Sequence, residues 1–125
     1  MILKAKNLKK YYQRGPEVVK ALDGVDFNIQ ENEIVSIIGP SGSGKTTLMN
    51  LISCLDNPSS GILKINHMDV TSLSESELIK IRRENIGFVF QRFYLIPTLT
   101  VRENIELPLL FARKMPENAK IVKIL

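Results

Sequence analysis

The stretch of sequence that decides the fold is Gly39-Pro40-Ser41-Gly42-Ser43-Gly44-Lys45-Thr46. It fits the phosphate-loop pattern G-x-x-x-x-G-K-[ST] without a gap. Glycines adopt backbone angles that other residues resist, so such a loop can fold around an anion with its N–H groups pointing inward. A helix that begins at Lys45 adds free N–H groups and a favourable dipole. The stretch therefore predicts a phosphate-binding loop.

The segments on either side of the loop support this interpretation. Residues 34–38 are almost wholly apolar and β-branched, which is typical of a strand covered on both faces, as in a parallel sheet. Residues 45–55 carry one apolar helical face, made of Leu48, Leu51, Ile52 and Leu55. Strand, loop and helix follow in the order that a phosphate loop needs. A Gly/Ser turn that matches by chance is therefore the weaker interpretation.

Two loop side chains have predicted roles in binding a nucleotide. We expect Lys45 to bridge the β- and γ-phosphates as a point charge, and the Thr46 hydroxyl to reach a Mg²⁺ ion. The loop alone does not choose between ATPases, GTPases and small-molecule kinases. A GTPase would carry Asn-Lys-x-Asp for the guanine base, and the sequence has no such stretch.

Antiparallel strands are predicted on both sides of this core. Leu3 to Asn7 alternate weakly, and a loop is expected over residues 11–16 because of Gly15-Pro16. Val25, Phe27 and Ile29 alternate with polar residues, which indicates a half-buried strand. A short strand is expected over residues 62–65, followed by a surface turn at Asn66-His67.

The second half of the chain predicts two helices and one further strand. Ser74 with Glu77 forms a capping box before a helix over residues 75–83, with Leu78 and Ile81 facing inward. The apolar residues 86–90 predict a buried strand that ends at Gln91. Thr100 with Glu103 forms a second capping box, and Pro108 is expected to break or kink the helix that follows.

Composition excludes several classes of protein. The 125 residues carry 17 Lys+Arg against 13 Asp+Glu, a net charge of +4, with scattered lysines and no Trp. A nucleic-acid binder would show a denser basic stripe with interleaved aromatics, so no nucleic-acid partner is expected. A single cysteine forms no intrachain disulfide and no cysteine-pair metal site. No secretory signal or membrane-length apolar run is present, so we expect a cytoplasmic location unless a partner holds the chain at a membrane.

The order of motifs resembles the nucleotide-binding domain of ABC transporters. The stretches that carry the resemblance are Leu8-Lys9-Lys10-Tyr11-Tyr12, Ala21-Leu22-Asp23-Gly24-Val25-Asp26-Phe27, Gly39 to Leu48, Asn57-Pro58-Ser59-Ser60-Gly61 and Ile86-Gly87-Phe88-Val89-Phe90-Gln91. A finer resemblance, to the subgroup for lipoprotein release and macrolide-type export, rests on Cys54-Leu55-Asp56, Lys80-Ile81-Arg82-Arg83, Phe93-Tyr94-Leu95-Ile96-Pro97 and Glu106-Leu107-Pro108-Leu109. The resemblance covers residues 1–111, whereas residues 112–125 do not match.

The resemblance implies roles at matching positions. Tyr12 is similar to the aromatic that stacks on adenine, with Tyr11 as the alternative by one residue. Gln91 is similar to the glutamine that completes the magnesium shell and senses the γ-phosphate, and Thr47 adds an α-phosphate contact. The segment Phe93-Tyr94-Leu95-Ile96-Pro97 then either docks on a membrane permease or packs as local core. His67 departs from the usual glycine and is expected in a surface turn, not in catalysis.

The fold class implied is α/β: a P-loop NTPase core with an antiparallel β subdomain and a truncated helical arm. We expect residues 1–30 and 61–66 to form the antiparallel part and residues 33–55 and 85–91 the phosphate-loop core. Residues 98–125 would begin the helical arm, with a divergent tail from residue 112. The implied cofactors are ATP and Mg²⁺, and the implied partners are a membrane permease and a second ATP-binding domain at the inner face of the cell membrane.

Three catalytic elements of the family are absent from the sequence. It has no Leu-Ser-Gly-Gly-Gln signature, no apolar strand ending in Asp-Glu and no later switch histidine. Phosphoryl transfer depends on positioned charges, so we expect this N-terminal half-domain to bind ATP without hydrolysing it alone. The chain would be a fragment, a truncated gene product or one piece of a split protein. The alternatives are a non-catalytic nucleotide-binding module and a poorly folded remnant.

Overall fold

The computed structural model describes residues 1–112 of the chain. These residues belong to two compact units, Met1–Ile86 and the unit that begins at Gly87. Across the described residues, no helix has both the length and the apolar character needed to cross a bilayer.

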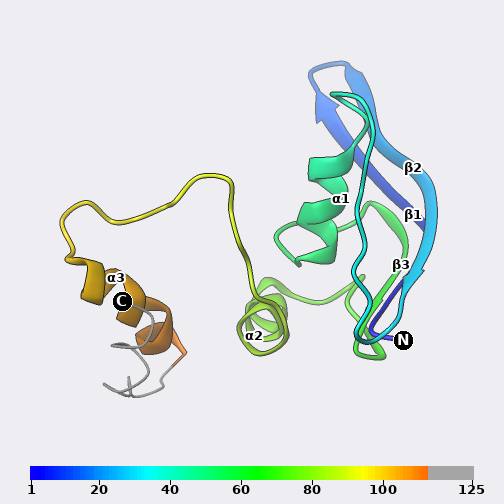
Figure 1. Cartoon of the computed structure of the whole chain (residues 1–125). Helices are drawn as coiled ribbons and strands as arrows, with labels where there is room; N and C mark the ends of the chain where they lie inside the picture. Colours follow the sequence, from blue (N-terminus) through cyan, green and yellow to red (C-terminus); the bar gives the residue numbers. More distant parts are fainter. Residues whose placement is uncertain (113–125) are drawn as a thin grey trace. The chain divides into compact units, whose positions relative to one another are not determined.

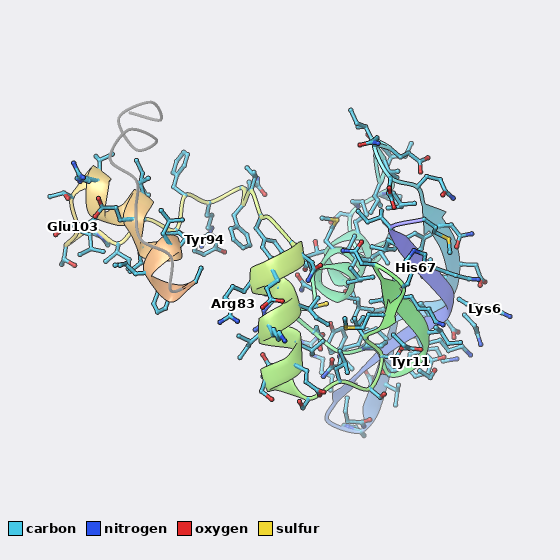
Figure 2. All side chains as sticks on the ribbon, turned by 90° about the horizontal axis from the view of Figure 1, so that it is seen from below. Lys6, Tyr11, His67, Arg83, Tyr94 and Glu103 are labelled. Carbon is cyan, nitrogen blue, oxygen red and sulfur yellow. The ribbon has the colours of Figure 1, made fainter. Side chains whose placement is uncertain are left out.

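The first unit is built on a four-stranded antiparallel sheet, in the order β2-β1-β3-β4 (Figure 1). Its strands are β1 (Leu3–Arg14), β2 (Glu17–Ile29), β3 (Ser60–Ile65) and β4 (Met68–Asp69). The alternation of Val25, Phe27 and Ile29 is confirmed as part of β2. The two-residue turn between β3 and β4 is Asn66-His67, both in the left-handed region, at φ 47° and 66°. His67 is exposed there, as expected for a surface turn (Figure 2).

The predicted loop over residues 11–16 is mostly strand. β1 continues through Tyr11 and Tyr12 to Arg14, and Arg14 pairs with Glu17 of β2. Only Gly15-Pro16 connects the two strands, with Gly15 in the left-handed region at φ 59°. The prediction was wrong because the turn signal at Gly-Pro needs two residues only, and paired aromatic residues favour strand.

Within residues 1–112, three helices lie where the sequence predicted helical segments, but their ends differ from the prediction. α1 spans Lys45–Ile52 and stops before the predicted end at Leu55. It ends early because the Ser53 hydroxyl donates to Met49 O at 2.5 Å and Cys54 adopts a left-handed φ of 55°. Leu55 lies beyond the helix and is exposed, so it does not complete the apolar face.

Both predicted capping boxes are confirmed. Ser74 and Glu77 cap α2 (Glu75–Asn85), and Thr100 and Glu103 cap α3 (Val101–Phe111). Pro108 does not break α3. The proline removes one N–H donor, but the ladder resumes after it, because Ala112 N donates to Pro108 O at 3.1 Å.

The core of the first unit lies between one face of the sheet and the helices α1 and α2. The predicted inward positions Leu78 and Ile81 of α2 are buried there. The buried residues of this cluster are Ala5, Leu8, Leu22, Leu51, Cys54, Leu63, Ile65, Val70, Leu78 and Ile81.

The two predicted parallel strands are absent from the described structure. Residues 34–38 run as an unpaired trace, with Ile34 98% and Ile38 90% exposed (Figure 1). Residues 86–90 likewise form no strand, and Val89 is fully exposed. A strand exists only when a neighbour accepts and donates its backbone hydrogen bonds, and no described residue pairs with either segment. The prediction of paired, buried strands at residues 34–38 and 86–90 was therefore wrong for the described structure.

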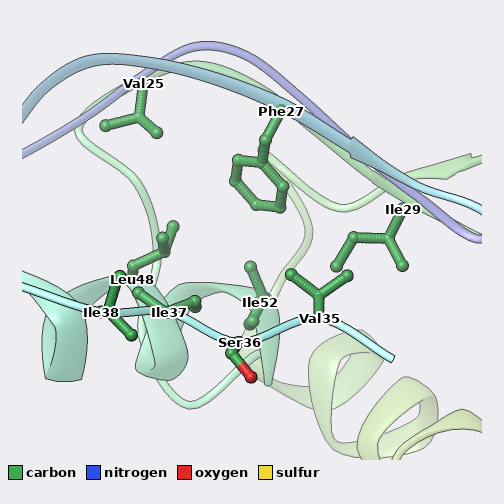
Figure 3. A pocket seen from close by; sticks show the side chains of 9 residues that line it. All are labelled: Val25, Phe27, Ile29, Val35, Ser36, Ile37, Ile38, Leu48 and Ile52. Carbon is green, nitrogen blue, oxygen red and sulfur yellow. The ribbon is translucent and has the colours of Figure 1, made fainter. Parts of the chain in front are cut away.

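An open apolar cavity lies beside residues 35–38. It has a volume of about 330 Å³ and lies between this segment, β2 and α1 (Figure 3). Figure 3 shows Val25, Phe27 and Ile29 of β2 on one side, with Leu48 and Ile52 of α1 opposite.

Candidate functional site

The phosphate loop leads directly into α1, whose first residue is Lys45. Gly44 precedes it in the left-handed region at φ 87°, and within the described residues no side chain caps this helix end. The first helical amide with an intrahelical acceptor is that of Leu48, which donates to Gly44 O at 2.8 Å. The amides of residues 45–47 therefore have no acceptor within the helix, and no acidic residue lies in its first turn. This end of α1 is suited to an anion.

Close packing on β2 explains why glycine is needed at position 44. A Cβ placed on Gly44 would lie 2.5 Å from the backbone oxygen of Ala21. Gly42 also has a left-handed φ, 79°, but a Cβ there would meet no atom within 4 Å. Gly44 thus serves both backbone conformation and contact with the strand, whereas Gly42 serves conformation alone.

The side chain of Lys45 folds back over the loop. Its ammonium donates to Gly39 O at 2.9 Å and to Pro40 O at 2.6 Å, and it lies 3.3 Å from the Ser43 hydroxyl. These partners are neutral oxygens, so the positive charge of Lys45 stays without a counter-charge inside the loop. A charged group held in this way attracts an anion more strongly than a neutral donor does.

A cavity of about 600 Å³ lies between the phosphate loop and β2. Its volume falls within the usual range for small-molecule sites, about 300–1,000 Å³. The predicted site residues that line it are Ser41, Gly42, Gly44, Lys45, Thr46 and Thr47. The remaining loop residues, Gly39, Pro40 and Ser43, contact the Lys45 ammonium instead.

Three lining residues from β2 were missed by sequence reasoning. They are Val19, Lys20 and Ala21. No local pattern could have found them, because they line the cavity only through the pairing of β2 with β1 and the seating of Gly44 on Ala21. Lys20 adds a second cationic side chain, whose ammonium lies 3.4 Å from Asp23.

The structure distinguishes Tyr12 from Tyr11. Tyr12 pairs across the sheet with the lining residue Val19, and its hydroxyl donates to Asp56 Oδ2 at 2.8 Å. Burial raises the pKa of the Tyr12 phenol, as does its bond to Asp56, while the hydroxyl of the lining residue Thr47 lowers that pKa. The Tyr11 hydroxyl bonds to Asp23 instead. Tyr11 pairs with another lining residue, Lys20, but of the two tyrosines it is Tyr12 that interacts with Thr47.

The carboxylate of Asp56, which accepts a hydrogen bond from the Tyr12 hydroxyl, is stabilised in its ionised form by its own partners. Burial raises the pKa of Asp56, but hydrogen bonds from Lys10, Tyr12 and the Asn57 N–H outweigh burial, and the pKa lies below its ordinary value. Asp56 is therefore ionised at neutral pH.

Gln91 belongs to the second unit. It is exposed and lies in a segment that forms neither helix nor strand. The neighbouring aromatic rings form a local group: Phe88 stacks on Phe90 at 5.4 Å, and Phe90 meets Tyr94 edge-on at 5.0 Å. The role of Gln91 at magnesium stays a prediction.

We compared the sequence with known protein families and with the sequences of known proteins. A family model described as "ABC transporter" matches residues 22–125. The chain is 54% identical over 110 residues to an uncharacterised ABC transporter ATP-binding protein of Methanocaldococcus jannaschii, covering 88% of this chain and 47% of that protein. It is 43% identical over 111 residues to the macrolide export ATP-binding/permease protein MacB of Shigella flexneri, covering 89% of this chain and 17% of that protein.

Solved structures agree with the sequence relatives. A dimeric ATP-binding cassette in a post-hydrolysis state, bound to ADP and Pi, matches with a TM-score of 0.87 and 50% identity over 98% of this chain and 53% of that one. The chain thus spans about half the length of the Methanocaldococcus jannaschii protein and of that cassette. The P-loop NTPase class expected from the sequence is confirmed by these neighbours. On the extent of the family match and the level of identity, this chain belongs to the ABC transporter ATP-binding family.

Proposed function

We propose that this chain binds ATP with Mg²⁺ in the cavity between the phosphate loop and β2, as part of an ATP-binding subunit of an ABC transporter. The observation that carries the proposal is the Lys45 ammonium, held by neutral oxygens inside a loop whose helix-start amides have no intrahelical acceptor. That combination favours phosphate-bearing anions.

The residues that line the cavity fit a nucleoside triphosphate. Two cationic side chains, Lys20 and Lys45, line it, and no Asp or Glu is among the described lining residues. In our proposal the amides of residues 41–47 hold phosphate oxygens and Lys45 lies between the β- and γ-phosphates. The Thr46 hydroxyl would hold Mg²⁺, and Thr47 would contact the α-phosphate. Bound Mg²⁺ supplies neutralising charge to the phosphates.

Lys45 must change partners when the nucleotide binds. Lys45 is half-buried, but its bonds to Gly39 O and Pro40 O are exposed to solvent, so water can replace it at both carbonyl oxygens. Exchanging two neutral acceptors for anionic phosphate oxygens is favourable, because the charged ammonium then also gains the attraction of opposite charges.

The proposal extends to binding without turnover by this chain alone. Its sequence holds no carboxylate pair at the end of an apolar strand, which would position water. It also holds no signature motif, which would contact the nucleotide from its other side. The intact system would be an ATPase that drives a permease. The permease and a second ATP-binding domain are proposed partners because one relative's name joins both activities and a similar cassette is dimeric. The chain would then lie at the inner face of the cell membrane.

A titration with a fluorescent ATP analogue and Mg²⁺ tests the proposal. Lys45→Ala is the test variant, and Lys6→Ala is the matched control because Lys6 is exposed on β1, outside the cavity lining (Figure 2). We expect saturable binding by the wild type and the control, and a loss of at least about 100-fold in Lys45→Ala, in line with two charge-assisted bonds. Equal affinities in all three proteins would refute the site. Lys45-dependent phosphate release by the pure chain would refute binding without turnover.

A further inference from the structure

The Tyr12 ring is held from two sides by charged residues. Its hydroxyl donates to Asp56 Oδ2 at 2.8 Å, and the Lys10 ammonium lies 4.9 Å from the ring centroid. The same ammonium is 2.6 Å from Asp56 Oδ1 and donates to Asn57 O at 2.7 Å. Tyr12 and Lys10 come from β1, whereas Asp56 lies after α1, so the three residues form a closed bracket between two elements.

The bracket is partly shielded from water. The side chain of Lys10 is 12% exposed and that of Asp56 is 30% exposed. Asp56 Oδ1 also accepts from the Asn57 N–H at 2.8 Å, so both carboxylate oxygens are engaged. A shielded, multiply bonded carboxylate holds its partners more firmly than a surface ion pair does.

Part of Tyr12 stays accessible to solvent. Lys10 covers one face through a cation–π contact, yet Tyr12 as a whole is still 38% exposed. Tyr12 pairs with Val19 and interacts with Thr47, and both of these residues line the phosphate cavity. A planar base that stacks on the ring face opposite Lys10 would place the Tyr12 ring between the base and the Lys10 ammonium.

We propose that Asp56 and Lys10 are positioning residues for the base of the bound nucleotide, because they fix the Tyr12 ring while leaving the residue partly exposed beside the cavity lining. This inference rests on the proposed nucleotide function. It assigns to Asp56 and Lys10 a share of the affinity for the nucleobase and none of the affinity for the polyphosphate, which belongs to the loop and Lys45.

A merely structural bracket makes a different prediction. If the bracket only joined β1 to the turn after α1, its loss would disturb the loop and weaken every ligand of the cavity equally. The ratio of MgATP affinity to Mg-tripolyphosphate affinity separates the two roles, since tripolyphosphate has no base to stack.

The test measures that ratio by isothermal calorimetry on the full chain. Tyr12→Phe keeps the ring and removes its tether, and Asp56→Ala removes the acceptor. We expect each to lower the ratio by about two- to tenfold, the usual net effect of one hydrogen bond, with the double variant no worse than either single one. Tyr11→Phe, which removes a similar bond to Asp23, and Asp69→Asn, a charge-matched change on β4, should leave the ratio unchanged.

Each other outcome overturns the inference. An unchanged ratio in Tyr12→Phe and Asp56→Ala, with a wild type that prefers MgATP, would refute positioning while leaving the proposed function intact. Equal weakening of both ligands would show a structural bracket. A wild type that binds neither ligand would refute the proposed function, and this inference with it.

Discussion

Replacing Gly44 with alanine tests how the phosphate loop is seated on the sheet. Gly44 and Gly42 have similar left-handed φ angles, 87° and 79°. A new Cβ at position 44 would lie 2.5 Å from Ala21 O and 3.0 Å from Leu22 Cδ2, whereas one at position 42 meets nothing within 4 Å. The pair of variants therefore separates backbone strain, which both carry, from the clash with β2, which only Gly44→Ala carries.

The expected magnitudes follow from these distances. A non-glycine residue in the left-handed region costs about 1–2 kcal/mol, which is the whole expected loss for Gly42→Ala. Forcing an extra carbon into a packed site costs about 1–3 kcal/mol more, because neither the strand backbone nor the buried Leu22 yields freely. The free energy of unfolding of Gly44→Ala should therefore fall by about 2–5 kcal/mol.

Urea denaturation followed by far-ultraviolet circular dichroism measures both losses. The same variants should be titrated with MgATP, where Gly44→Ala is expected to bind more weakly than Gly42→Ala because its loop is displaced from β2. A Gly44→Ala variant no less stable than Gly42→Ala would refute the close seating of the loop on Ala21.

Three further predictions concern the surrounding fold. A Cβ on Gly61 would lie 2.3 Å from Asn7 O. Gly61→Ala should therefore speed amide exchange in β1 and β3 and lower the unfolding free energy by at least about 2 kcal/mol. Because the pKa of Asp56 lies below its ordinary value of 3.8, its ion pair stabilises the fold above that pH and is lost as the pH falls further. The Tm of Asp56→Asn should accordingly fall less on acidification than that of the wild type. Thr100→Ala removes a cap and should destabilise α3 by about 1 kcal/mol, seen as faster amide exchange over residues 101–111, and an unchanged exchange rate would contradict the capping box.

Local signals in the sequence predicted local structure well. The capping boxes at Ser74 and Thr100 and the left-handed turn at Asn66-His67 depend on side chains within a few residues, and all were found as predicted. The alternation around Phe27 likewise indicated the strand that forms.

Structure that depends on a distant neighbour was predicted less well. Residues 34–38 have the composition of a buried parallel strand, but composition does not name the partner strand that must supply hydrogen bonds. The same holds for the candidate site. The phosphate loop was readable from its pattern, whereas Lys20 joins the cavity only through strand pairing, and Asp56 meets Tyr12 only because the chain after α1 returns to β1.

The uncovered run at residues 34–38 has a consequence for handling the protein at the bench. Two isoleucines almost wholly in water, on a β-branched backbone that no described strand covers, form a surface to which a second molecule can add in register. Aggregation should therefore increase with protein concentration and with the age of the sample, and turbid or fibrous material should appear in concentrated stocks before it appears in dilute assays. A charged residue in place of Ile34, which is 98% exposed and outside every described cavity lining, offers a simple way to raise the usable concentration.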